Sequence, residues 1–321
     1  MLFYRARPGA DCVATVGLSG ATVRAVVGPR RCICSPFGDF AWSPRGDEIA
    51  VAEWLPTEES PKNAGIAFVR PDGSTVRPPL ASRGIDLRWS PDGAMLAWSG
   101  ADDRVHVASA DGSDERTVPA VSPGEDLSPA WSHDGNDVAF VHCGRACDSI
   151  FGDIYVAPAD GRTVPDRITR DGWDAEPAWS LDGRYLAVVH AFGKHRGRWR
   201  IDVVDVVSRL RRVFVRCTYE CEDPAWSPDG VSLAYLGNYR EGHVTTGPEL
   251  RVVSANGEDD RPLALKFEQL RRTGTEVSFS WSPSGDRLAF EHLSNGDRDG
   301  KGGIFVVRSD GSGLRQLTRE P

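Results

Sequence analysis

The stretch AWSPDGVSLAY (225–235) decides the fold, because five further copies of the same short pattern stand elsewhere in the chain. Every copy places Trp-Ser before a tight turn that contains glycine, and then resumes with an apolar residue, alanine and a second apolar residue. The tryptophans of successive copies lie 47, 42, 48, 47 and 55 residues apart, a period typical of structural repeats that stack on their neighbours. The other copies are AWSPRGDEIAV (41–51), RWSPDGAMLAW (88–98), AWSHDGNDVAF (130–140), AWSLDGRYLAV (178–188) and SWSPSGDRLAF (280–290).

A second predicted hairpin follows each copy. Five of the six carry Asp-Gly or Asn-Gly at the turn, the strongest short-range signal for a β-hairpin. Two hairpins per period predict four antiparallel strands, which make one blade of a β-propeller. The glycine of each Trp-Ser turn is expected to take the left-handed backbone conformation. The second hairpins span residues 65–77, 105–118, 153–164, 201–215, 250–263 and 303–318.

Residues 1–38 contain no Trp-Ser copy, yet they show strand patterns. The segment CVATVGLSGATVRAVV (12–27) is typical of the last two strands of a blade, and MLFYRA (1–6) resembles the second-strand pattern RLAFEH (287–292). We therefore predict an all-β chain, a single β-propeller over 1–321 with seven blades. Residues 1–38 form an incomplete first blade, whose missing strand is absent or belongs to a longer natural protein, and 39–321 form six complete blades. The alternative is six blades with an N-terminal hairpin.

Composition excludes two classes of partner. The net charge of −8 and the isoelectric point near 5.4 argue against a general affinity for nucleic acid. No window of about 18 consecutive apolar residues occurs, so no membrane span is predicted.

The seven cysteines bear on the compartment of the protein. Cys143 with Cys147, and Cys217 with Cys221, are spaced for short local disulfides, which persist in oxidising compartments. Free thiols and a zinc site are the alternatives, and the pairing of the remaining cysteines is left open. We predict a periplasmic or extracellular protein whose leader is not visible, with the cytoplasm as the alternative.

The pattern AWSPDG…LAF…DIYV…ADG…LT resembles the TolB-type propeller, also called the WD40-like or PD40 repeat, over residues 39–321. The resemblance implies a propeller that binds other proteins. TolB proteins of envelope transport also carry an α/β domain before the propeller, and no segment of this chain resembles one.

Long loops are predicted at one end of the blades, the end opposite the short Trp-Ser turns, and functional residues are often placed on such loops. Two of the loops, 190–199 and 236–249, combine basic and aromatic residues. We predict that these residues form a binding patch for a protein, peptide or glycan; simple solvation of the charges is the alternative. The predicted patch comprises His190, Lys194, His195, Arg196, Arg198, Trp199, Tyr239, Arg240 and His243.

Acidic residues recur three positions before the tryptophan, at Asp39, Asp86, Glu176 and Asp223. The first strand of a blade lines the propeller axis, so these carboxylates are candidate ligands for calcium at the channel mouth. The alternative is that they accept hydrogen bonds from loop amides and fix the turn into the strand. Histidines recur eleven positions after the tryptophan, at His142, His190 and His292, where structural hydrogen bonds are expected.

No motif of a known catalytic site occurs: neither Gly-x-Ser-x-Gly, a P-loop, a dinucleotide fingerprint nor His-Glu-x-x-His is present. We therefore predict a non-catalytic binding scaffold without a cofactor, apart from the candidate calcium. The alternatives are a metal-dependent hydrolase of the lactonase type at the channel mouth and a sensor propeller of a larger protein.

Overall fold

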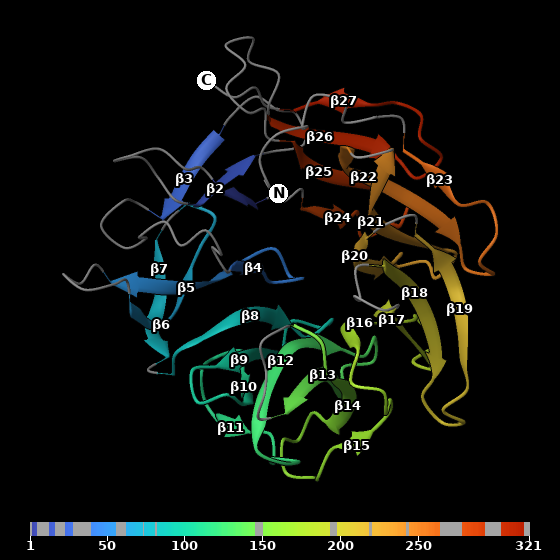
Figure 1. Ribbon diagram of the computed structural model, residues 1–321. Coiled ribbons are helices and arrows are strands. Elements are labelled where there is room, and N and C mark those ends of the chain that lie inside the picture. Colours follow the sequence, from blue (N-terminus) through green and yellow to red (C-terminus); the bar gives the residue numbers. More distant parts are fainter. Residues whose placement is uncertain are drawn as a thin grey trace. The chain divides into compact units, whose positions relative to one another are not determined.

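The structure is a computed structural model in which every regular element of the described residues is a β-strand, β1 to β27 (Figure 1). The part of the chain that the structure describes comprises residues 2–4, 13–16, 23–27, 40–55, 62–72, 74–80, 82–144, 150–192, 198–217, 220–241, 244–263, 278–292 and 303–317.

The first of two compact units comprises Met1–Gly17 and Ala21–Gly172. It contains one three-stranded and three four-stranded antiparallel sheets, each ordered in space as in the sequence (Figure 1). The three-stranded sheet comprises β1 (Leu2–Tyr4), β2 (Val13–Val16) and β3 (Val23–Val27). The four-stranded sheets comprise β4 (Phe40–Trp42), β5 (Ile49–Leu55), β6 (Lys62–Val69) and β7 (Thr75–Leu80); β8 (Gly84–Trp89), β9 (Met95–Gly100), β10 (Val105–Ser109) and β11 (Arg116–Thr117); and β12 (Gly124–Trp131), β13 (Asp137–Gly144), β14 (Asp153–Pro158) and β15 (Asp166–Arg167).

The second unit comprises Leu18–Gly20 and Trp173–Pro321 and contains three four-stranded antiparallel sheets. Their strands are β16 (Asp174–Trp179), β17 (Tyr185–Phe192), β18 (Arg198–Asp205) and β19 (Arg211–Arg216); β20 (Glu220–Trp226), β21 (Ser232–Glu241), β22 (Val244–Ser254) and β23 (Arg261–Pro262); and β24 (Phe279–Trp281), β25 (Arg287–His292), β26 (Gly303–Arg308) and β27 (Arg315–Gln316). That the two units form one propeller domain over 1–321 stays a prediction.

The prediction of seven blades is wrong. The described residues form six four-stranded blades, one for each Trp-Ser copy, and β1, β2 and β3 form a separate three-stranded sheet. The reason is visible in the repeat, because each complete blade takes its first strand and first turn from a Trp-Ser copy, and residues 1–38 contain none. The prediction of an all-β fold built from four-stranded antiparallel blades is confirmed.

The chemistry of the Trp-Ser turn explains its sequence. In the copy at 88–98, the hydroxyl of Ser90 donates to Asp92 Oδ1 at 2.6 Å and accepts a bond from the backbone N–H of Met95 at 2.9 Å. These bonds replace the ladder contacts that a turn lacks. The six turn glycines have φ between 66° and 75°, so the expected left-handed conformation is confirmed. At Gly285 a Cβ atom would also lie 2.7 Å from the carboxyl carbon of Asp229, so the Asp229 side chain would have to move.

The tryptophan of the repeat joins successive blades. The indole N–H of Trp89 donates to the backbone oxygen of Ala41 at 3.0 Å, and Trp131 donates in the same way to Arg88 at 2.9 Å. Each of the main apolar clusters contains residues of two consecutive sheets, such as Phe68 with Leu96. The hydrophobic core therefore lies between the blades, as stacking repeats require.

Candidate functional site

The acidic positions before the tryptophan lie on a β-bulge that recurs in the first strand of the blade. The register shifts by one residue in β8, β12, β16 and β20. The residue three positions before the tryptophan has a left-handed backbone in all four strands, with φ of 55° at Asp86, 53° at Ser128, 50° at Glu176 and 52° at Asp223. Short polar side chains tolerate this conformation better than most residues other than glycine. Asp86, Ser128 and Asp223 follow this preference, whereas it does not explain the longer side chain of Glu176.

Two of these carboxylates hold the backbone of the next blade. Asp86 accepts a bond from the N–H of Ser128 at 3.1 Å, and Glu176 accepts one from the N–H of Asp223 at 2.6 Å. The alternative of hydrogen bonding to amides is correct in kind, although the amides belong to the next first strand rather than to a loop. Calcium binding stays a prediction, and Asp39 lies outside the described residues.

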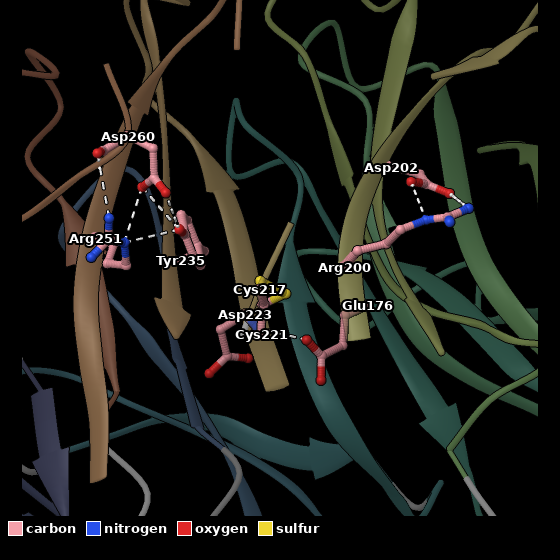
Figure 2. Close-up of a disulfide and its surroundings, with 9 residues drawn as sticks. All are labelled: Glu176, Arg200, Asp202, Cys217, Cys221, Asp223, Tyr235, Arg251 and Asp260. Carbon is pink, nitrogen blue, oxygen red and sulfur yellow. Dashed lines mark hydrogen bonds and ion pairs between the residues drawn. A yellow bond between two sulfur atoms is a disulfide. The ribbon is translucent and has the colours of Figure 1, made fainter. Parts of the chain in front are cut away.

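A disulfide lies next to the Glu176–Asp223 contact (Figure 2). Cys217 and Cys221 are bonded as predicted, with their Cα atoms 6.0 Å apart. Cys221 lies in β20, two residues before Asp223, and its side chain is fully buried. The disulfide thus fixes the entry into the strand that carries the bulge. Cys143 is also a disulfide cysteine, but Cys147 lies outside the described residues, so their pairing stays a prediction.

The predicted basic-aromatic patch is described only in part. Arg198 is exposed at the start of β18, while Trp199 packs against the apolar cluster between the β16–β19 and β20–β23 sheets. Tyr239 and Arg240 lie in β21, but their side chains are outside the described part of the structure. Lys194, His195, Arg196 and His243 also lie outside the described residues.

His190, the remaining patch residue, lies in a buried polar cluster instead of on a loop. It is the cross-strand neighbour of Asp174, and its Nδ1 lies 2.9 Å from Asp174 Oδ1. The guanidinium of Arg211 pairs with Asp174 and also with Asp202, which Arg200 binds with two nitrogens (Figure 2). Both carboxylates are fully buried. Two arginines thus compensate the two buried acids, and only 11% of the His190 side chain is exposed.

The equivalent pair in the first unit has different neighbours. His142 is the cross-strand neighbour of Asp126, with Nδ1 2.7 Å from Asp126 Oδ1. On its other side, His142 Nε2 lies 2.6 Å from the hydroxyl oxygen of Ser122. Arg104, in the turn before β10 of the preceding blade, lies 3.3 Å from Asp126 Oδ2. Burial raises the pKa of Asp126, whereas the hydrogen bond from His142 and the charges of His142 and Arg104 oppose that rise.

Sequence reasoning grouped the histidines correctly but missed their partners. The expected structural hydrogen bonds of His142 and His190 are confirmed, and the side chain of His292 lies outside the described part. Asp126 and Asp174 stand five positions before the tryptophan of their copies, and the histidines stand eleven positions after it. This paired spacing could have predicted that the aspartate and the histidine of one copy lie close together. Ser122 and Arg104 carried no signal, because neither position belongs to the repeated pattern.

These blades, joined through tryptophan, bulge and turn, define a β-propeller of the TolB class. The chain belongs to this family, since the family model described as TolB beta propeller domain matches residues 12–273. A curated relative, the Tol-Pal system protein TolB of Anaeromyxobacter dehalogenans strain 2CP-C, is 29% identical over 131 residues. The match covers 41% of this chain and 26% of the relative, so the chain matches about a quarter of that protein.

Two solved structures show the same fold. The putative TolB from Agrobacterium tumefaciens superposes with a TM-score of 0.54 and 19% identity, over 73% of this chain and 79% of that one. A puromycin-hydrolyzing peptidase of Mycobacterium tuberculosis reaches a TM-score of 0.65 with 17% identity, over 96% of this chain and 50% of that one. In the described part of the chain, no helix is long and apolar enough to cross a membrane.

Proposed function

We propose that the chain is a protein-binding scaffold of the Tol-Pal type, which engages a protein or peptide partner through the loop ends of its blades. The observation that carries the proposal is the family match together with a rigid blade end in the second unit. There, Glu176 holds the backbone of Asp223, and the Cys217–Cys221 disulfide fixes the chain just before it. A preorganised surface of this kind loses little conformational entropy when a partner binds.

The charge of the chain favours a partner with a basic segment. The net charge is −8, and the acidic bulge residues Glu176 and Asp223 lie beside the disulfide (Figure 2). Complementary charge steers association and selects among partners more than it raises affinity. The curated relative is named for the Tol-Pal system, so the Pal lipoprotein of the same organism is the first partner to test. The disulfide supports a periplasmic or extracellular location.

Binding of purified Pal to the chain tests the proposal. We expect saturable binding, weakened about tenfold by Asp223→Asn, because this change removes an exposed carboxylate that complements a basic segment of the partner, and tenfold corresponds to about 1.4 kcal/mol. Asp310→Asn is the matched control, because Asp310 is also exposed but lies in the turn between β26 and β27. Absence of binding to Pal would reject the Tol-Pal partner. Equal affinities of the two variants would reject the loop-end surface.

Calcium at the bulge carboxylates is a separate proposal. Adding calcium should raise the unfolding temperature of the wild type, because a ligand that binds only the native state stabilises it. The rise should be smaller in the Glu176→Gln and Asp223→Asn double variant, whose two positions are in contact within the second unit. An unchanged unfolding temperature of the wild type in millimolar calcium would reject the calcium proposal.

A further inference from the structure

Ser122, His142 and Asp126 form a continuous hydrogen-bonded chain at the end of the β12–β15 blade. Ser122 Oγ lies 2.6 Å from His142 Nε2, and His142 Nδ1 lies 2.7 Å from Asp126 Oδ1. This is the order of groups that activates a serine, with a nucleophile, a general base and a carboxylate that orients the base. We propose that Ser122 is an activated nucleophile that accepts the acyl group of a small activated ester, an activity beyond the binding function proposed above.

The carboxylate determines the direction of the hydrogen bonds. An ionised Asp126 only accepts, so His142 Nδ1 must carry the proton and donate it. In the neutral imidazole Nε2 is then a free acceptor, and the hydroxyl of Ser122 is its donor. The imidazole is thereby held in the tautomer that a general base needs.

Burial separates the base from water but leaves the nucleophile accessible. Asp126 is 1% exposed and His142 is 6% exposed, whereas Ser122 is exposed. A small electrophile can therefore reach Ser122 without displacing the pair behind it. The low polarity around Asp126 also strengthens its electrostatic effect on the imidazole.

Arg104 holds the serine in place from the preceding blade. Its guanidinium donates to the backbone oxygen of Gly124 at 3.0 Å and to that of Ser122 at 3.5 Å, and it also binds Asp126. The turn that carries Ser122 is thus tied to the same residue that compensates the buried carboxylate. The positive charge next to Ser122 also favours the negative charge that develops on the substrate oxygen during attack.

Two further groups near His142 lie on β14. The ring of Tyr155 lies edge-on to the imidazole, with the ring centres 5.5 Å apart. Asp153 is the cross-strand neighbour of His142 and pairs with Arg167. Together with Asp126 and Arg104, these groups set the charge environment in which His142 takes up a proton.

The equivalent blade of the second unit provides an internal comparison. Asp174 and His190 form the same pair, but Arg170 stands at the position that corresponds to Ser122, four residues before the aspartate. The cation of Arg211 lies 2.9 Å from His190 Nδ1. The histidine of that blade therefore takes part in an ion-pair cluster and faces no serine at the equivalent position.

The proposed reaction is acyl transfer followed by hydrolysis. Ser122 Oγ attacks the carbonyl carbon of the ester while its proton moves to His142 Nε2. The bond to the leaving oxygen breaks, and that oxygen takes the proton from Nε2. Water then attacks the acyl-serine with His142 as base, which releases a carboxylic acid and restores the hydroxyl of Ser122.

A fluorophosphonate probe tests the nucleophile directly. Ser122 Oγ attacks phosphorus, fluoride leaves, and the proton passes through His142 to solvent, so the serine keeps a stable phosphonyl group. Mass spectrometry of the digested wild type should show labelling of Ser122 at least about 100-fold faster than of Ser113, the lower range for general-base catalysis. Ser113 is the internal control, because it is an exposed serine of the same unit whose hydroxyl donates to Asp111 instead.

Variants of the two histidines show whether Ser122 is labelled because His142 activates it or only because it is exposed. His142→Gln should slow labelling of Ser122 about 100-fold or more, whereas His190→Gln should leave it unchanged. Equal labelling of Ser122 and Ser113 in the wild type would overturn the proposal even if a variant fails to fold, and it would leave the hydrogen bond as a structural contact. Binding of Pal is measured independently, so failure of either proposal does not imply failure of the other.

Discussion

The Asp126–His142 and Asp174–His190 pairs occupy the same position of the repeat but have different surroundings. In the second unit, Arg211 contacts both members, and the pair belongs to a buried cluster with balanced charge. In the first unit, the cation comes from the preceding blade, and the second nitrogen of the histidine faces an exposed serine. The repeat therefore specifies the pair, while residues outside the repeat decide what the pair does.

Removing Asp174 should have the largest effect on stability. Asp174→Ala removes the carboxylate of His190 and leaves Arg211 and Arg200 to share Asp202 alone, and breaking a buried pair in this way costs about 3–5 kcal/mol. Denaturant unfolding of the full chain, followed by tryptophan fluorescence, measures the loss. Asp310→Ala is the control, because Asp310 is exposed in a turn of the same unit. A loss below about 1 kcal/mol would contradict the assignment of this pair to a structural cluster.

The disulfide should have the next largest effect. Its cysteines are four positions apart, so replacing both Cys217 and Cys221 with serine releases a short closed loop, which costs about 2 kcal/mol in the chain-entropy model. Reduction of the wild type should cost at least as much, because it also opens the disulfide of Cys143. The double variant should also bind Pal more weakly, because the segment before Asp223 is no longer fixed. Unchanged stability and unchanged binding would show that the disulfide does not contribute to the proposed binding site.

Lowering the pH should change stability in opposite directions through the turn carboxylates and through Asp126. Backbone bonding from Ser208 and the Arg184 guanidinium lower the pKa of Asp205 to about 2, and the hydroxyls of Ser284 and Ser282 lower that of Asp286 to about 2. Their stabilisation is complete above the usual pKa of about 4 and is lost as the pH falls towards 2. Burial raises the pKa of Asp126 despite its bonds to His142 and Arg104, so ionisation of this group instead reduces stability as the pH rises above about 4.

Thermal unfolding between pH 5 and pH 2 measures this effect. The unfolding temperature should fall steeply below pH 4, and Asp286→Asn should make the fall shallower because one of the titrating groups is removed. A slope that Asp286→Asn does not change would mean that this carboxylate does not contribute.

Replacing Ser122 should have the smallest effect on stability. Ser122 is exposed and lies outside the core, so Ser122→Ala should change the free energy of unfolding by less than about 0.5 kcal/mol. The same variant should abolish labelling at this position. A large loss of stability would indicate that the hydroxyl of Ser122 stabilises the fold. The Asp126–His142 pair would then be structural, like the Asp174–His190 pair.

The fold was predictable because its chemistry is local. The Trp-Ser turn contains its own hydrogen-bonding groups, and its glycine needs a left-handed backbone that few other residues adopt. The blade count failed because strand-like patterns in residues 1–27 were counted as a blade without a Trp-Ser copy to supply its first strand.

The candidate site was less predictable because a β-bulge determines which residue lies opposite Asp126. Continuing the register of Trp131 opposite Val138 without a shift would place Asp126 opposite Cys143. The left-handed residue Ser128 shifts the strand by one position, so that Asp126 faces His142 instead. A one-residue shift of this kind is invisible in the repeat and changes every cross-strand partner beyond it.

The protonation of His142 tests the central claim most directly. Nitrogen-15 NMR of the imidazole at a pH where it is neutral distinguishes the two tautomers. We predict a proton on Nδ1, bonded to Asp126, with Nε2 unprotonated and accepting from Ser122. A proton on Nε2 would contradict the account, because Ser122 would then be the acceptor and His142 would have no free nitrogen with which to activate it.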